Sequence, residues 1–253
     1  MQNSDYLISE NPMKALVVFS LPMIIGNLFQ QAYTMADSAI VGRLVGENAL
    51  AAVGAAYSLT KIFICIAIGG GMGASVIVSQ YFGRGSYGKL KKAIYTALIS
   101  FLVISGILGG FGLLCSRNIM IALNTPAEVL DMSVTYLKIY FLGLPFLFMY
   151  NVLSSMFNAL GKSRIPLYFL IFSSVFNIVL DWSFVADFHL DVAGVAWATL
   201  IAQGVSVVGS FVVLLRELQK LEGNADGIFA KEELLPMTKI AVPSILQQST
   251  VSI

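Results

Sequence analysis

The sequence has 253 residues, of which 57% are hydrophobic and only 11% are charged. Soluble domains usually carry about 25% charged residues, so this composition predicts an integral membrane protein rather than a soluble one. A formal net charge of +1 provides no basic surface for nucleic acid, and no nucleic-acid partner is expected.

Six apolar segments are long enough to cross a bilayer, which takes about 20 residues in a helix. After a polar N-terminal segment, residues 1–14, which does not resemble a cleavable signal peptide, the expected spans are roughly 15–42, 49–80, 90–115, 128–158, 165–187 and 191–215. A seventh begins near Leu234 and runs to Ile253. The connections are short and polar, so we expect an all-α bundle embedded in the lipid bilayer.

The basic residues set the expected orientation. If the N-terminus is cytoplasmic, the second, fourth and sixth loops are cytoplasmic as well, and the loops on the opposite side hold only Arg43 and Arg117. Cytoplasmic loops carry an excess of lysine and arginine. The sequence therefore predicts a multi-pass protein of the plasma (inner) membrane with these basic residues inside: Arg84, Lys89, Lys91, Lys92, Lys162, Arg164, Arg216, Lys220 and Lys231.

Two aspartates stand alone inside apolar segments, Asp37 in the first span and Asp181 in the fifth. A carboxylate at membrane depth is costly unless it is paired, protonated or bound to an ion, and it therefore indicates a functional site. Both spans run outward, and each acid is about five or six residues from the outer end, roughly 8–9 Å below it. The two acids are expected at one depth.

Polar residues follow the two acids at helical spacing. Asn177 lies one turn before the fifth-span acid, Gln30 and Tyr33 share the face of the first-span acid, and Thr199 of the sixth span lies at a similar depth. Such an oxygen-rich cluster could bind a hard cation such as Na⁺ or hold protons. The alternative is that each acid only hydrogen-bonds a neighbouring helix.

Other features have structural or hinge interpretations. Pro22 and Pro145 fall inside apolar spans, where proline kinks a helix, and Pro22 could act as a hinge that moves the first acid. The glycine-rich run 69–73 lacks the lysine of a phosphate loop and predicts close helix packing. His189, the one histidine, cannot form a metal cluster and is expected at the surface.

The start of the seventh segment echoes the first span. Residues 240–248 and residues 19–27 share one pattern, an apolar run followed by a proline. In both segments an amide side chain stands five residues after the proline. Repeated halves are a common plan in transporters. The echo suggests that a second six-helix half begins here.

Several segments resemble the MATE (multidrug and toxic compound extrusion) family. They are LPMIIGNLFQQAYTMADSAIVGRLVGENALAAVG, SQYFGRG, PFLFMYNVLSSMFNALGKSRIP, FNIVLDWSFV and DVAGVAWATLIAQ, and together they lie between about residue 14 and residue 253. The resemblance implies a six-transmembrane-helix N-lobe of a twelve-helix, two-lobe antiporter, residues 15–217. A cytoplasmic linker, 218–233, and the start of the second lobe, 234–253, would follow.

The resemblance also assigns roles. It implies a cation site at Asp37, Asn177, Asp181 and Thr199, with Gln30, Tyr33 and the bending proline Pro22 beside it. No enzyme activity and no cofactor are implied, only Na⁺ or H⁺ as coupling ion. The remainder of the second lobe is expected as a partner.

The leading functional hypothesis is export of small organic, often cationic, substrates coupled to inward Na⁺ or H⁺ movement. A flippase for lipid-linked precursors is an alternative, but its lumen should be basic, and only Lys61 and Lys138 lie within spans. An intramembrane aspartyl protease lacks its Gly-x-Gly-Asp motif. A non-transporting truncated fragment is the fourth possibility, raised by the length of the chain.

Overall fold

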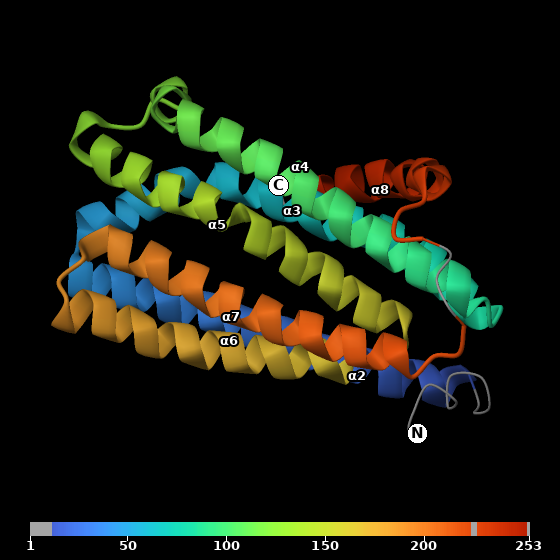
Figure 1. The fold of residues 1–253 in the computed structure, drawn as a ribbon. Helices are drawn as coiled ribbons and strands as arrows, with labels where there is room; N and C mark the ends of the chain where they lie inside the picture. Colours follow the sequence, from blue (N-terminus) through green and yellow to red (C-terminus); the bar gives the residue numbers. More distant parts are fainter. Residues whose placement is uncertain (1–11, 224–226, 252–253) are drawn as a thin grey trace.

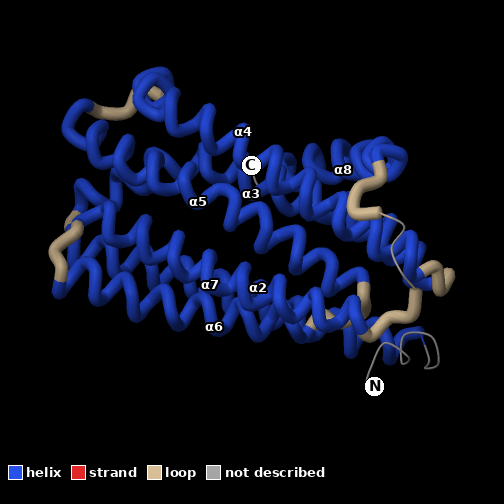
Figure 2. Tube along the Cα trace, in the orientation of Figure 1, coloured by secondary structure: helices blue, strands red, loops and turns tan. Residues whose placement is uncertain are grey.

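The computed structural model describes residues 12–223 and 227–251, and within them every regular element is helical. Two short π-helical segments, η1 and η2, extend the C-terminal ends of α2 and α6. Figure 1 shows the elements in chain order, and Figure 2 shows that only short loops join them. The elements are α2 (Pro12–Ile40), η1 (Val41–Val45), α3 (Glu47–Gly83), α4 (Tyr87–Ala122), α5 (Ala127–Ala159), α6 (Arg164–Trp182), η2 (Ser183–Asp187), α7 (Asp191–Gln219) and α8 (Lys231–Val251).

The predicted all-α membrane fold is confirmed, and six helices of the described chain are long and apolar enough to cross a membrane. Each coincides with a predicted span, although most run several residues further at one or both ends. Helix α8 is present from Lys231 but is not among these six. The segment between α7 and α8 is shorter than the predicted linker 218–233, because α7 continues to Gln219 and α8 begins at Lys231. The first helix begins at Pro12, inside the expected polar segment 1–14, and residues 1–11 lie outside the described part.

The helices are arranged as two groups that share a central contact. In Figures 1 and 2, α2, α6 and α7 lie together, and α3, α4 and α5 lie together with α8 beside α3. Helix α5 packs on α3 and α4 and also on α7, so it joins the groups. Helix α2 packs on α6 and η1, whereas α3 packs on α5, α8 and α4. Away from η1, α2 and α3 therefore have different partners.

The core lies along α5. Phe141 and Phe148 are buried in one apolar cluster with residues of α3 and α4, and Phe157 is buried in a second cluster nearer the α8 end. Phe63 of α3 meets Phe141 edge to face, with 5.3 Å between ring centroids. Aromatic pairs in this geometry stabilise beyond their buried area. Much of the buried apolar core thus lies within the α3–α4–α5 group.

Glycines close two of the tight turns. Gly46, between η1 and α3, has φ 115°, and Gly85, between α3 and α4, has φ 67°. Glycine adopts these φ values without strain. It therefore permits turns of one residue before α3 and of three residues before α4. Because the turn at Gly46 is so short, η1 at the C-terminal end of α2 and the start of α3 are held together.

The contact between α3 and α8 depends on two further glycines. A Cβ at Gly69 would lie 2.6 Å from Ile245 Cα, and one at Gly73 would lie 2.6 Å from the Met237 carbonyl oxygen. These separations leave no room for a side chain, so the backbones of the two helices touch. Small residues permit such close approach between membrane helices. The predicted packing role of the glycine run is confirmed, with α8 as its main partner.

Polar contacts fasten the segment before α8 to the same group. Lys91 Nζ donates to the carbonyl oxygens of Leu221 (3.0 Å) and Gly223 (2.8 Å). The buried backbone N–H of Ala230 donates to Thr96 Oγ1 at 2.9 Å. The Tyr81 hydroxyl donates to Glu233 Oε1 at 2.7 Å. Helix α8 is therefore held against α3 and α4 at its start as well as along its length.

Enlarging either contact glycine should loosen α8. We expect Gly69→Ala and Gly73→Ala each to destabilise the chain by about 1–3 kcal/mol, the usual cost of overpacking, because α8 must move away. The measurement is the thermal unfolding midpoint of the detergent-solubilised chain. Gly54→Ala is the matched control in the same helix, since nothing lies within 4 Å of its Cβ position. Equal midpoints for Gly73→Ala and Gly54→Ala would contradict the close contact.

Candidate cation site

The two intramembrane aspartates meet. The carboxyl groups of Asp37 in α2 and Asp181 in α6 interact directly through their side chains. Asp181 is fully buried and Asp37 is half-buried. The Oδ1 atom of each is buried without a hydrogen-bond partner. The expectation of one shared depth is thus met, and each acid retains an oxygen free to take a proton or a cation.

Asn177 lies at the centre of the polar contacts. Its amide nitrogen donates to Asp181 Oδ2 (2.9 Å) and to the Tyr33 hydroxyl (2.8 Å), and its oxygen accepts from Thr199 N (3.0 Å). With the amide turned by 180°, its nitrogen would reach only Thr199 Oγ1, at 3.4 Å. The first orientation satisfies both ends of the amide.

Tyr33 and Thr199 complete the cluster from α2 and α7. A hydrogen bond joins the Tyr33 hydroxyl to the Thr199 side chain. Thr199 Oγ1 in turn donates to the Val195 carbonyl oxygen at 3.1 Å. Three helices thus contribute oxygen or amide groups to one position. These contacts fix how α2 is rotated about its own axis relative to α6 and α7.

An apolar cluster covers the end of the site near the π-helical segments. Val41 of η1 and Val185 of η2 are buried together with Val192 and Val195 of α7 and Ala49 of α3. The two π-helical segments begin four residues after Asp37 and two residues after Asp181. Segments of this kind are frequent at functional sites. The cluster shields the acids from the nearby loops.

A polar cavity adjoins the opposite side of the site. It offers about 50 Å³ to the centres of water-sized molecules, and its lining includes Gln30, Tyr33, Asn177 and Thr199. Gln30 is exposed, so the cavity opens past α2. The remaining lining residues are Tyr150, Leu170, Ser173, Ser174, Ala202 and Gln203. The polar route to the acids passes through this cavity rather than through the valine cluster.

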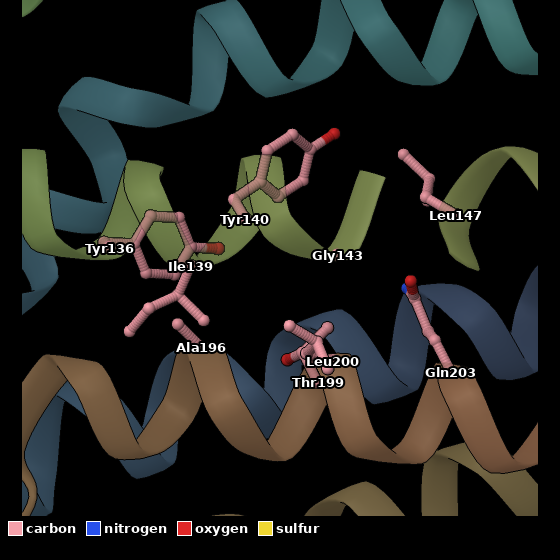
Figure 3. Close-up of a pocket in the computed structure, with 9 residues that line it drawn as sticks. All are labelled: Tyr136, Ile139, Tyr140, Gly143, Leu147, Ala196, Thr199, Leu200 and Gln203. Atoms are coloured by element: carbon pink, nitrogen blue, oxygen red, sulfur yellow. The ribbon is translucent and has the colours of Figure 1, made fainter. Parts of the chain in front are cut away.

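A second cavity lies between α5 and α7 and is shown in Figure 3. Thr199 and Gln203 of α7 point toward α5 and line both cavities. Tyr136 of α5 is close enough to feel the charges of Asp37 and Asp181. Gly143 and Leu200 both line this cavity, and a Cβ at Gly143 would lie 3.3 Å from Leu200 Cγ.

Most of the predicted site residues lie together in the structure. Asp37, Asn177, Asp181, Thr199 and Tyr33 come together, and Gln30 lies at the mouth of the cavity, without contacting the acids through any described hydrogen bond. Sequence reasoning missed Tyr136, Tyr150, Ser173, Ser174 and Gln203. Helical spacing could have found three of them, because Ser173 and Ser174 precede Asn177 by one turn and Gln203 follows Thr199 by one turn.

Pro22 is buried, and α2 continues through it. On the side before Pro22, the Ser163 hydroxyl donates to the Phe19 carbonyl oxygen at 3.1 Å, which ties α2 to the start of α6. On the side after it, Gly26 faces Leu167 and Leu170 of α6, at 3.7 and 3.6 Å from its Cβ position. The proline thus separates a hydrogen-bonded segment from a segment that carries Asp37.

The described residues hold no group of three or more His, Cys, Asp or Glu side chains that could bind a metal ion. His189 is exposed, as predicted. The site therefore has two carboxyl groups surrounded by neutral donors and acceptors. This chemistry suits a monovalent cation or protons better than a transition metal.

A polytopic helical membrane protein with a buried, oxygen-rich pair of acids is the class that the fold and the site define. The family model described as MatE matches residues 22–183, and the chain belongs to this family.

Known relatives extend the match over nearly the whole chain. The chain is 30% identical over 243 residues to the probable multidrug resistance protein YpnP of Bacillus subtilis, covering 96% of this chain and 54% of YpnP. It is 27% identical to the multidrug export protein MepA of Staphylococcus aureus, covering 95% of this chain and 54% of MepA. The chain thus spans about half the length of the curated relatives it matches.

Solved structures show the same fold. The chain matches an outward-facing multidrug resistance MATE family transporter of the MOP superfamily with a TM-score of 0.91 and 24% identity, covering 100% of this chain and 56% of that one. It matches a MATE crystal structure in the straight conformation with a TM-score of 0.90 and 25% identity, with the same coverage. The fold agrees with one lobe of such a transporter.

The amide of Asn177 should matter for stability as well as for the site. We expect Asn177→Leu to destabilise the chain by about 1–2 kcal/mol, because the Tyr33 hydroxyl and the Asp181 carboxyl group each lose the hydrogen bond that the Asn177 amide nitrogen donates to them. Thermal unfolding in detergent measures the effect. Asn27→Leu, at an exposed amide of α2, is the control. A larger loss in Asn27→Leu than in Asn177→Leu would contradict the network.

Proposed function

We propose that this chain forms the cation-binding lobe of a secondary active exporter that exchanges inward-moving Na⁺ or H⁺ for small organic, often cationic, substrates. The observation that carries the proposal is the contact between Asp37 and Asp181, each with a buried oxygen that lacks a partner. Membership of the MatE family and the similarity to multidrug export proteins support two parts of the proposal, the outward direction of transport and the class of substrate.

Like charges explain why the pair calls for a cation. Two carboxylates about 4 Å apart repel by about 4 kcal/mol at an effective dielectric constant of about 20. A bound Na⁺ or a shared proton removes this repulsion, so the site has different energies with and without the ion. The coupling ion, Na⁺ or H⁺, binds in this proposal at Asp37, Asn177, Asp181 and Thr199.

The amide of Asn177 allows the same cluster to serve both states. In the structure its nitrogen donates to Asp181 and Tyr33. A 180° rotation presents the amide oxygen to the acids, where it can coordinate a cation. Na⁺ takes oxygen ligands from carboxylate, amide and hydroxyl groups, as hard cations do. In this proposal Asn177 therefore joins Asp181 to Tyr33 in one amide orientation and supplies a ligand to the cation in the other.

Coupling to transport requires that the ion bind the two states of the transporter differently. Asp37 sits on α2, and Pro22 divides α2 into a part tied to Ser163 and a part that carries the acid. We propose that neutralising the acids frees the second part to shift about Pro22. Its movement changes the shape of the substrate path next to Gln30 and Tyr33.

The organisation around the lobe is part of the proposal. The bias of basic loop residues supports a cytoplasmic N-terminus in the plasma membrane. Residues 15–217 form the N-lobe, residues 218–233 include the linker between lobes, and residues from 234 begin the second lobe. Alternating access needs two bodies that move against each other, so this lobe works with a second one.

Ion binding can be measured on the chain itself. We expect Na⁺ to raise the thermal unfolding midpoint relative to equal choline chloride, by about 2.7 kcal/mol of stability at 100 times Kd. If H⁺ is the ion, lowering the pH gives the stabilisation instead. Asp37→Asn and Asp181→Asn should each abolish the response, because one carboxyl group remains without its partner.

Asp131→Asn, at an exposed acid that pairs with Arg117, is the control and should keep the response. A response that persists in both site variants would place the ion elsewhere. No response to either ion in the unmodified chain would refute a cation site in this lobe.

Transport is tested in a complete transporter that contains this lobe. Dye efflux from cells is followed under imposed Na⁺ and pH gradients. We expect Asp37→Asn and Asp181→Asn each to reduce gradient-driven efflux to the background of cells without the protein, since neither variant can cycle its charge. Efflux that is unchanged in both variants would remove the two acids from the mechanism.

A further inference from the structure

The polar cavity beside the acids is lined at two levels. Three of its lining residues belong to the candidate cation site, namely Tyr33, Asn177 and Thr199. A second set of amide and hydroxyl side chains, which we call the neutral ring, lines the same cavity one helical turn away: Gln30, Ser173, Ser174 and Gln203. The ring residues carry no charge, and they come from α2, α6 and α7, the three helices that form the cation site.

The contacts of α6 show in which direction its neighbours run. Ser163, just before α6, donates to the Phe19 carbonyl oxygen of α2, and the two acids meet near the other ends of these helices, so α2 and α6 run parallel. Glu217, near the end of α7, pairs with Lys162, which also precedes α6, so α7 runs the opposite way. Positions that precede the site on α2 and α6 are therefore level with positions that follow it on α7.

The residues of the neutral ring meet this condition. Those on α2 and α6 precede the site residues by three or four positions, and Gln203 of α7 follows Thr199 by four. Each shift amounts to about 4.5–6 Å along the helix. Figure 3 shows Thr199 and Gln203 on one side of α7, as expected of residues one turn apart. The neutral ring thus lies at one depth, next to the acids and on the side away from the valine cluster.

The side chains of the neutral ring need partners from the cavity. Among the described residues, no hydrogen bond ends on the side chain of Gln30, Ser174 or Gln203. Ser174 is only 3% exposed, and buried polar groups are normally hydrogen-bonded to protein, water or a ligand. The cavity offers about 50 Å³ to the centres of water-sized molecules, several times the roughly 10–15 Å³ that one water needs. The ring therefore faces a space that accommodates water or an ion.

The chemistry of the neutral ring suits one of the two coupling ions. Amide and hydroxyl oxygens are ligands of hard cations. In potassium channels, rings of neutral carbonyl oxygens replace the water molecules around an ion. Amide and hydroxyl groups do not take up a proton near pH 7, in contrast to carboxylates. Of the two ions in the proposed function, only Na⁺ can therefore occupy the ring.

We propose that the neutral ring is a second Na⁺ site, which the ion occupies on its way between the two acids and the mouth of the cavity at Gln30. The inference rests on the proposed export function and specifies Na⁺ as its coupling ion. Without a carboxylate of its own, the ring holds Na⁺ more weakly than the acid pair does. Ions move along adjacent sites that bind them firmly enough to enter and weakly enough to leave. The valine cluster covers the other end of the acid pair, so the ring lies on the remaining route.

Equilibrium binding of radioactive Na⁺ to the full chain in detergent tests the second site. We expect two components in the unmodified chain, one at the acid pair and a weaker one at the neutral ring. Gln203→Met, which removes the amide at similar size, and Ser174→Ala should each weaken the second component about 10-fold, as expected for one lost contact to a charged group. The first component should stay within about 3-fold of its value in the unmodified chain, a small change on the free-energy scale.

A charge placed in the neutral ring gives the opposite change. Gln203→Glu adds a carboxylate next to the remaining ring oxygens, and it should strengthen the second component about 10-fold or more. Gln219→Met and Gln219→Glu are the matched controls, because Gln219 is an exposed amide at the end of the same helix. Both controls should leave the two components unchanged. A purely structural role of Gln203 would give no gain in Na⁺ affinity on adding the charge.

The outcomes separate this proposal from the proposed function. A single Na⁺ component in the unmodified chain, which would mean that the ring holds only water, would overturn the second site alone. Equal effects of the substitutions at Gln203 and Gln219 would overturn it as well. Stabilisation by low pH without Na⁺ binding would refute the ring and leave an H⁺-coupled function standing. A strong component that persists in both Asp37→Asn and Asp181→Asn would instead refute the cation site at the acids.

Discussion

The contact between two carboxyl groups inside an apolar bundle constrains most of this lobe. Asp37 and Asp181 come from helices that are distant in sequence, and they meet only if α2 and α6 adopt one register. The amide of Asn177 and the hydroxyl of Tyr33 make that register specific, because each finds its partner only there. Buried polar groups that are fully paired select one packing arrangement over others. The unpaired Oδ1 atoms are the exception, and they mark the position where an ion changes the balance.

The surroundings of the pair decide from which side an ion or a substrate approaches. The valine cluster of η1, η2 and α7 covers one end, and the polar cavity at Gln30 adjoins the other. Water and ions follow polar linings, so the cavity is the favoured route. The same cavity is lined by the exposed amide of Gln30 on α2.

Much of the fold followed from the sequence because hydrophobicity in a bilayer is a strong local signal. Six spans of sufficient length, and the depth of both acids within them, needed only helix rise and loop charges. Asn177 was found because residues one turn apart share a face. Tyr136 was missed because its proximity to the acids depends on how α5 is rotated against α7, and that rotation is set by tertiary packing around Phe141 and Phe148. The glycines at 69 and 73 predicted a close contact, but only the structure identified α8 as the partner.

Helix α2 carries Asp37 and Tyr33 of the proposed cation site, and this explains how an ion held within one lobe could act on the outside of the helix. One face of α2 carries Asp37 and Tyr33 against α6 and α7, and a face roughly 100° away carries Asn27 and Gln31. A rigid rotation or bend of the segment after Pro22 moves both faces together. The gain from relieving repulsion between the acids, a few kcal/mol, is comparable with the cost of breaking the two or three hydrogen bonds that hold the segment. In the proposed mechanism, the balance between these quantities, rather than the strength of either, would let an ion switch the position of the helix.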